Sequence, residues 1–401
     1  MGKFVFVSYL SARISIALAS SMLSVAIGWH LFTFSEDPFD LALVGLMQIT
    51  PMMLLFIVSG WVNDHFSRKN ILVLCAVVEA CVYIGLALSM NGGDLNRPMI
   101  FSLLFIHGTV RTFYAPASSA ILPNIVSTDY LSRAIAITST TWTTAQTLGP
   151  LVAGILIALV DYGTYWFMLA LVILGAVLYL QLPPLKTTKP LGRGIDQLLD
   201  GIRYVKRDPI VWPSISLDLF IMLCGSVMAL LPVYAVNVLE VGTISLGFMR
   251  AMPALGGVMM GVLLARLPPR RNSGRLLFIA LGVFSASILV FAISSVLWLS
   301  LIALWVYGAS DMISVNIRST LIQLATPDVL RGRVNAVNML FIGISNEMSD
   351  FRAGSVAAVL GPVLTVLAGA GMAFMVTLGG YKLFPELRNL DKLTDAEAKE
   401  E

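Results

Sequence analysis

Ionisable side chains lie inside stretches of this sequence that are otherwise long and apolar. Such groups are costly in an apolar segment, and they usually face an aqueous cavity or pair with one another. A carboxylate held there could bind and release a proton, and an arginine could contact an anion or balance a carboxylate. The candidates for proton binding are Asp218, Asp311, Glu347 and Asp350. The candidates for contacting a substrate or partnering these carboxylates are Arg13, Arg111, Arg318 and Arg352.

Helical spacing groups some of these candidates. Glu347 and Asp350 are three residues apart and share a helix face, whereas Arg352 points elsewhere unless it bends back. Asp311 and Arg318 are seven residues apart and also share a face. The second pair has two interpretations, a proton site or a salt bridge that only holds helices together.

Arg111 follows His107 by one helical turn and is our candidate for contacting an anionic substrate. The alternative is that Arg111 caps carbonyl groups of a kinked neighbouring helix. Glu79 lies in the third apolar stretch, and we rank it below the other carboxylates.

Composition identifies the elements that carry these residues. Of the 401 residues, 57% are hydrophobic and 12% are charged, with a mean hydropathy of +0.86. A soluble domain carries roughly 25% charged residues, and a bilayer core needs about 20 apolar residues per helix. We therefore predict an all-α membrane protein with twelve transmembrane helices. The predicted spans are 6–34, 41–62, 71–90, 98–121, 134–158, 163–182, 210–237, 243–266, 276–294, 297–323, 334–358 and 361–384.

Charge in the connectors predicts the orientation. Lys and Arg gather in the connectors that follow even-numbered spans, and Asp and Glu dominate the others. Basic connectors stay in the cytoplasm, so both termini should be cytoplasmic, and we expect the first span to be retained rather than cleaved as a signal peptide. The stretch 183–208, rich in Pro, Gly and basic residues, is predicted to be a cytoplasmic linker between six-helix bundles at 1–182 and 209–401.

The two halves share a sequence pattern. The segment 122–136 recurs loosely as 321–336, at an offset of about 200 residues. In each copy a span ends, an Asp follows in a short loop, and an Arg opens the next span. Duplicated halves of this kind are typical of transporters that bind their substrate between the halves.

The connector 60–70 carries Gly60, Asp64, Arg68 and Lys69, and it resembles the cytoplasmic loop motif of the major facilitator superfamily of secondary transporters. Ser67 stands where the family often has Gly. The resemblance implies a conformational latch for the outward-open state. Gly60 would permit close helix approach, Asp64 would accept hydrogen bonds, and the two basic residues would anchor at the anionic inner leaflet. The corresponding stretch after span eight lacks the acidic residue.

A second motif lies in span five, where Gly149, Pro150 and Gly154 resemble the helix-packing motif of the antiporter branches of the superfamily. The resemblance favours export by antiport, and an ordinary Pro-kinked helix is the alternative. An offset of 200 residues brings Gly154 to Gly354, in the segment that carries Glu347.

Segments 10–15, 113–117 and 325–333 resemble the bacterial siderophore-exporter branch of the superfamily. The resemblance implies the two-bundle fold, alternating access and a likeness in function. We expect a monomeric, proton-coupled antiporter that exports a small amphiphilic or anionic molecule across the bacterial inner membrane. The alternatives are a broad-specificity multidrug efflux pump, a proton-coupled importer and a membrane sensor that transports nothing.

The sequence lacks the motifs of ATP-driven transporters and of metal-dependent membrane enzymes. It has no nucleotide-binding loop, and its histidines, His30, His65 and His107, are scattered. We therefore expect no enzyme activity, no cofactor, no metal site and no nucleic-acid partner. The expected partners are the substrate, protons and the lipid bilayer.

Overall fold

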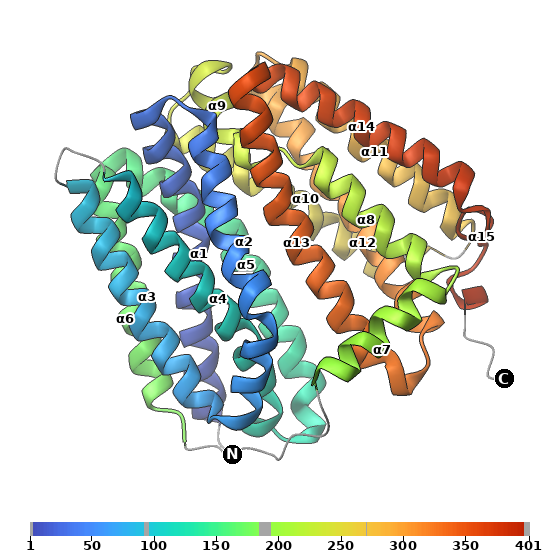
Figure 1. Ribbon diagram of the computed structural model, residues 1–401, viewed down its shortest axis with the longest axis horizontal. Helices are drawn as coiled ribbons and strands as arrows, with labels where there is room; N and C mark the ends of the chain where they lie inside the picture. The colour runs from blue at the N-terminus through green and yellow to red at the C-terminus, as the bar shows by residue number, and fades with distance from the viewer. Residues whose placement is uncertain (1–2, 92–95, 184–193, 270, 397–401) are drawn as a thin grey trace. The chain divides into compact units, whose positions relative to one another are not determined.

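The computed structural model describes residues 3–91, 96–183, 194–269 and 271–396, which form helices joined by short turns (Figure 1). These residues contain no strand. Five charged connector residues on which the orientation prediction depends lie outside the described residues: Asp94, Lys186, Lys189, Arg193 and Arg270. The chain divides into two compact units. The first comprises Met1–Glu36, Leu43–Gly192 and Val241–Ala251, and the second comprises Asp37–Ala42, Arg193–Glu240 and Met252–Glu401.

The first unit is a bundle in which α1 packs against α5 and α6, and α3 packs against α4 and α6. Its helices are α1 (Lys3–Ser35), α2 (Pro38–His65), α3 (Arg68–Asn91), α4 (Arg97–Ile125), α5 (Thr128–Val160), the 3₁₀ turn η1 (Asp161–Gly163) and α6 (Thr164–Leu180). Local sequence signals determine where α4 starts. The Asn96 side chain accepts a hydrogen bond from the Met99 backbone N–H at 3.2 Å, and Pro98 lies in the first turn.

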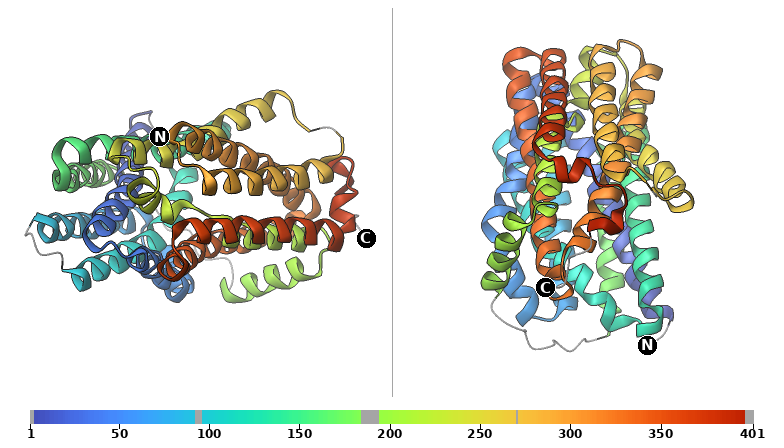
Figure 2. Two further views of the ribbon diagram at one scale, coloured as in Figure 1. Left: turned by 90° about the horizontal axis from the view of Figure 1, so that it is seen from above. Right: turned by 90° about the vertical axis from the view of Figure 1, so that its right-hand side faces the viewer.

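In the second unit, α11 packs against α12 and α14, and α8 packs against α13 and α14 (Figures 1 and 2). Its elements are α7 (Gly194–Arg207), α8 (Val211–Gly225), η2 (Met228–Leu230), α9 (Leu231–Asn237), α10 (Thr243–Arg266), α11 (Ser273–Ile293), α12 (Leu297–Ala325), α13 (Asp328–Leu360), α14 (Pro362–Leu383), α15 (Pro385–Arg388) and η3 (Leu393–Ala396). The first residues of α2 belong to this unit, and the first residues of α10 belong to the other.

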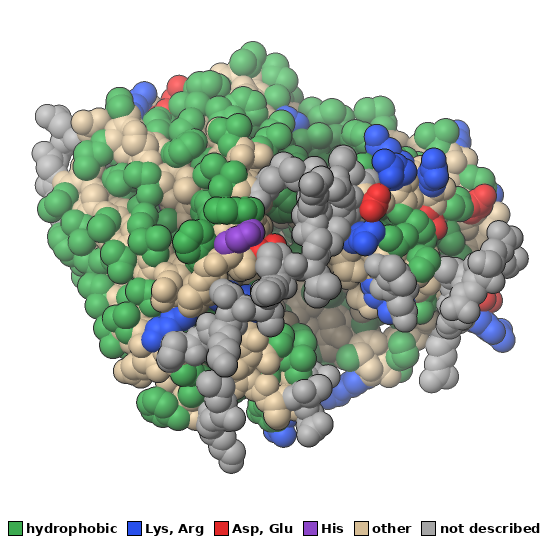
Figure 3. Space-filling model, turned by 60° about the horizontal axis from the view of Figure 1, so that its bottom comes forward, with side chains coloured by type: hydrophobic (Ala, Val, Ile, Leu, Met, Phe, Trp, Pro, Cys, Tyr) green, Lys and Arg blue, Asp and Glu red, His purple; other side chains and the backbone are tan. Residues whose placement is uncertain are grey.

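The chain is a multi-pass membrane protein. Within the described residues, nine segments are long and apolar enough to cross a bilayer. Residues 133–180 count as one such segment although they contain α5 and α6, whereas the more polar α4 and α13 are not among the nine. The count of twelve spans and the cytoplasmic termini therefore stay predictions. Hydrophobic side chains cover broad areas of the face in Figure 3, with Lys and Arg side chains in separate groups.

The predicted span 210–237 is not one continuous helix. α8 ends at Gly225, and η2 and α9 follow after Ser226 and Val227. Arg352 of α13 donates to the carbonyl oxygens of Leu223 and Cys224 at 2.7 and 2.9 Å. This guanidinium satisfies backbone groups that a continuing helix would have bonded, so the break is stable at membrane depth.

The predicted linker contains the helix α7, which packs on α13. A Cβ on Gly201 would lie 2.9 Å from the Arg333 carbonyl oxygen, and Asp200 pairs with the Arg333 guanidinium at 3.0 Å. The Tyr204 hydroxyl donates to the Ala325 carbonyl oxygen at 2.7 Å. Burial and the neighbouring Asp208 raise the pKa of Tyr204 to about 12, so the phenol keeps the proton that it donates.

Candidate functional site

A buried ion pair joins α8 and α12 in the second unit. Arg318 Nη1 lies 2.5 Å from Asp218 Oδ1, and the two side chains are 6% and 10% exposed. Arg318 Nε also donates to Ser314 Oγ at 2.9 Å. Helical spacing grouped Arg318 with Asp311, but the ion pair is formed with Asp218, which no spacing within α12 could indicate.

Asp311 lies on α12, two turns before Arg318 and about 10 Å away along the helix axis. Its Oδ1 atom is buried and has no hydrogen-bond partner among the described residues. A buried carboxylate oxygen without a donor is costly while the group is charged. Binding a proton removes that cost, so Asp311 is suited to gain and lose a proton.

Arg352 and the two carboxylates near it lie on α13. Arg352 holds the end of α8, where its positive charge meets the negative end of the helix dipole. Glu347 and Asp350 are partly buried. The structure therefore places Arg352 on backbone carbonyl groups, while the two carboxylates stay candidates for proton binding.

Arg13 links α1 to α4. Its Nη1 atom donates to the Tyr9 hydroxyl at 3.0 Å and to Ser118 Oγ at 3.1 Å. Its guanidinium carbon lies 5.9 Å from the centre of the Trp142 ring on α5. Arg13 Nε is buried without a hydrogen-bond partner among the described residues, so this guanidinium has a donor that the structure leaves unused.

Arg111 is exposed, and its Nη1 atom donates to Gln48 Oε1 of α2 at 2.7 Å. One turn earlier on α4, His107 is buried against Glu79 of α3. Sequence reasoning noticed His107 beside Arg111 but ranked Glu79 low. No sequence spacing connects two residues that are 28 positions apart on different helices.

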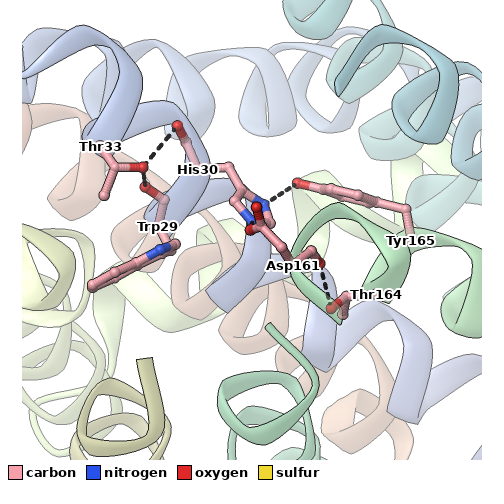
Figure 4. A network of polar contacts seen from close by, with 6 residues as sticks. All are labelled: Trp29, His30, Thr33, Asp161, Thr164 and Tyr165. Carbon is pink, nitrogen blue, oxygen red and sulfur yellow. Dashed lines mark hydrogen bonds and ion pairs between the residues drawn. The ribbon is translucent and has the colours of Figure 1, made fainter. Parts of the chain in front are cut away.

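A polar network joins the last turns of α1 to η1 and to the start of α6 (Figure 4). His30 Nε2 lies 3.0 Å from Asp161 Oδ1, and Nδ1 lies 3.1 Å from the Tyr165 hydroxyl. Asp161 has a φ of 49°, in the region that L residues rarely adopt. The contact with His30 holds this turn, and sequence reasoning did not single it out.

The model of one protein family, described as transmembrane secretion effector and carrying the major facilitator superfamily name MFS_3, matches residues 2–400. The chain belongs to this transporter family. Two similar curated relatives are named enterobactin exporter EntS. The protein from Citrobacter koseri is 24% identical over 93% of this chain and 91% of its own length. The protein from Escherichia coli O1:K1 is 24% identical over 90% of this chain and 86% of its own length.

Solved structures of other transporters share the fold. The nucleoside transporter NupG superposes with a TM-score of 0.74 at 14% identity, over 95% of this chain and 99% of that one. A bacterial homolog of the human lysosomal transporter Spinster, inward-facing and occupied, gives a TM-score of 0.77 at 13% identity, over 99% of this chain and 98% of that one. These similarities show the major facilitator fold.

The loop motif of this transporter makes backbone contacts. Arg68 Nη1 donates to the Ala120 carbonyl oxygen of α4 at 3.1 Å, and Lys69 donates to the carbonyl oxygens of Leu180 and Leu182 after α6. We expected both residues to anchor at lipid headgroups. In the structure Lys69 caps the end of α6, where a cation meets the negative end of the helix dipole, and Arg68 bonds a carbonyl group five residues before the end of α4. Anchoring of the two residues at the inner leaflet stays a prediction.

The other two residues of the motif lie in open surroundings among the described residues. Asp64 is exposed, and a Cβ on Gly60 would meet no described atom within 4 Å. The close helix approach expected at Gly60 is therefore not seen among the described residues. The latch role of Gly60, Asp64, Arg68 and Lys69 stays a prediction.

The glycines of the span-five motif lie at helix crossings. A Cβ on Gly149 would be 2.6 Å from Ser21 Oγ of α1. A Cβ on Gly154 would be 2.5 Å from the Thr243 carbonyl oxygen of α10, and one on Gly247 would be 2.7 Å from the Pro150 carbonyl oxygen. Small residues let backbones approach this closely.

The position 200 residues later shows the same geometry. A Cβ on Gly354 of α13 would lie 2.5 Å from the Ala42 backbone nitrogen and 2.8 Å from the Pro38 carbonyl oxygen of α2. Each glycine thus meets the first turns of another helix, α10 in the first unit and α2 in the second. The sequence repeat therefore corresponds to a repeated helix crossing.

We expect Gly154→Val to destabilise the crossing of α5 and α10, because the added carbons would meet backbone atoms that cannot rotate away. Overpacking of this kind costs about 1–3 kcal/mol. Thermal unfolding of the purified protein in detergent would measure the loss. The matched control is Gly282→Val in α11, where a Cβ meets no described atom within 4 Å. Equal melting temperatures of the two variants would contradict this account.

Proposed function

We propose that this transporter is a proton-coupled antiporter that exports a small acidic, siderophore-like molecule across the bacterial inner membrane. The observation that carries the proposal is Asp311, whose buried oxygen lacks a partner among the described residues, on the helix that also carries the Asp218–Arg318 ion pair. A carboxyl group in that state changes its charge by binding a proton. The transporter would function as a monomer by alternating access.

The relatives support the class of cargo and its direction. Both curated relatives reported above are named as exporters of enterobactin, a siderophore. The Gly149–Pro150 segment, which resembles the antiporter motif, agrees with export. Asp218, Glu347 and Asp350 are the further proton-binding candidates, and the exchange of one proton for one molecule would need only one of the four carboxylates.

Basic side chains of the first unit support an acidic cargo. Arg13 keeps a buried Nε atom without a partner among the described residues, and Arg111 is exposed. Guanidinium groups bind carboxylates and other planar anions through paired hydrogen bonds. These positions favour an acidic siderophore over the cationic compounds that a multidrug pump would also accept. Arg318 and Arg352, which bind Asp218 and the end of α8, are less available to a substrate.

Transport into proteoliposomes tests the proposal, with enterobactin as the probe. A pH gradient, acidic inside, should drive enterobactin into the vesicles as protons leave, and a protonophore should abolish this movement. Protein-free liposomes and a lipophilic cationic dye are the controls. Accumulation in the same direction as the protons would indicate an importer. Transport that ignores the gradient would overturn proton coupling, and equal transport of the dye would indicate a multidrug pump.

A further inference from the structure

A carboxyl group and an imidazole meet inside the first unit. His107 Nδ1 of α4 lies 2.7 Å from Glu79 Oε1 of α3, and the two side chains are 3% and 4% exposed. The second oxygen, Glu79 Oε2, is also buried, and the buried Tyr83 hydroxyl one turn later on α3 is close enough to interact with this carboxyl group. None of the motifs described above includes this pair.

Four ionisable groups among the described residues lie close to the pair. On α3 itself, Cys75 and Tyr83 face Glu79 one turn to either side. From the helices packed on α3, Arg111 of α4 and Tyr165 of α6 are close enough to interact electrostatically with Tyr83. Arg111 is therefore the nearby permanent charge, and it lies one turn beyond His107.

The charge of the pair depends on how many protons it holds. With one proton the pair is neutral overall, either as acid and imidazole or as carboxylate and imidazolium. A second proton would give a net positive charge beside Arg111, and loss of the proton would give a net negative charge opposite Arg111. Arg111 therefore opposes the doubly protonated state and favours the other two. The pair is suited to exchange one proton.

A purely structural hydrogen bond between α3 and α4 would not need a carboxyl group. An amide would donate or accept equally well. The carboxyl group instead adds a second buried oxygen, whose charge is costly in this setting, and binding a proton relieves that cost.

An exposed polar contact lies one helical turn from His107. Arg111 of α4 is exposed and donates to Gln48 Oε1 of α2 at 2.7 Å. Between them, Gly108 packs tightly against α2, where a Cβ would lie 2.8 Å from the Gln48 carbonyl oxygen. Water at the Arg111 side chain is therefore one helical turn from the pair.

We infer that Glu79 and His107 form a proton-binding site of the first unit, separate from the carboxylates of the second. The pair holds one proton between Oε1 and Nδ1 and exchanges it with water beside Arg111. Its use in the transport cycle rests on the proposed proton-coupled export, whereas the binding of a proton does not.

Infrared difference spectroscopy of the full-length protein in liposomes tests proton binding without transport. A pH titration of the wild type should show a carboxylic-acid carbonyl component that disappears in Glu79→Gln. In His107→Asn the midpoint of that component should move by about one pH unit or more, because the imidazole partner is gone. Asp311→Asn and Glu240→Gln, the latter at an exposed position outside the predicted spans, should both retain it.

Two results would overturn the inference: a Glu79→Gln spectrum identical to the wild type, or a midpoint that His107→Asn leaves in place. If Glu79→Gln does not fold, His107→Asn still tests the inference. The pH profile of enterobactin export separates the role in transport from proton binding. Glu79→Gln retains a hydrogen bond to His107, so an unchanged profile would leave the pair only a structural role in export. If export by the wild type does not respond to the pH gradient, proton-coupled export is refuted. The infrared result still shows whether Glu79 and His107 bind a proton.

Discussion

Replacing Asp311 by Asn is expected to abolish the response of transport to a pH gradient while the protein still folds and inserts into the membrane. Asn has nearly the shape of Asp but cannot exchange a proton. Since Oδ1 of Asp311 makes no hydrogen bond to a described residue, few contacts are lost. We expect a change in stability of about 1 kcal/mol or less. Gradient-driven transport should fall on the order of a hundredfold, as when a group that transfers a proton is removed.

Counterflow provides the internal control for Asp311→Asn. Exchange of labelled for unlabelled enterobactin across the vesicle membrane needs no net proton movement, so the variant should retain it. The matched variants are Glu347→Gln and Asp350→Asn, which replace the two candidate carboxylates of α13. If one of these loses the pH response and Asp311→Asn keeps it, the proton site lies on α13. If all three respond normally to the gradient, the proposed proton coupling through these residues is wrong.

The helix ranges could be predicted closely because the membrane imposes them. An apolar run must be about 20 residues long to cross the bilayer, and the ends of such runs are marked by polar connectors. Predicted span 243–266 coincides with α10, and span 297–323 ends two residues before α12 does. The break after Gly225 escaped prediction because the apolar sequence continues through Ser226 and Val227. The carbonyl groups at the break are bonded by a side chain 127 residues away, Arg352.

The candidate site was predictable only in its residue types. Ionisable residues within apolar spans stand out in a sequence, and Asp218, Asp311 and Arg318 were found that way. Their partners were not, because helical periodicity relates residues on one helix only. Arg318 therefore seemed to belong with Asp311, two turns away, and not with Asp218, 100 positions earlier. The buried Glu79 was underrated for the same reason.

The glycine crossings show where sequence comparison within the chain succeeds. Gly154 and Gly354 were aligned by the offset of the repeat alone, and both meet the backbone of another helix in its first turns. A glycine at a crossing cannot be replaced without moving a backbone, so it persists in both halves while neighbouring positions change. The charges of α13 occupy positions where α5 has Thr147, Pro150 and Val152. The two halves thus share the glycines of the helix crossing but differ in the ionisable residues beside them.

Removing one partner of the Asp218–Arg318 ion pair should have the largest effect on stability. In Asp218→Leu, the Arg318 guanidinium stays buried without its counter-charge, and its Nε contact with Ser314 cannot replace the lost ion pair. Breaking a buried pair in this way costs about 3–5 kcal/mol. Chemical unfolding in detergent micelles, followed by tryptophan fluorescence, would measure the loss. A loss below about 1 kcal/mol, the size of an exposed pair, would mean that the pair is solvated.

The double variant Asp218→Leu/Arg318→Met separates two roles of the ion pair, holding α8 to α12 and influencing the proton exchange of Asp311. Replacing both charges by apolar side chains removes the unpaired ion, so most of the lost stability should return. We expect the pH response of export to differ from that of the wild type, because Asp311 would have lost both charges of the ion pair, the Arg318 guanidinium and the Asp218 carboxylate. The pH profile of this variant should therefore be displaced from that of the wild type. Recovery of both stability and the wild-type profile would show that the pair only holds α8 to α12, and that Asp311 gains and loses its proton independently of both.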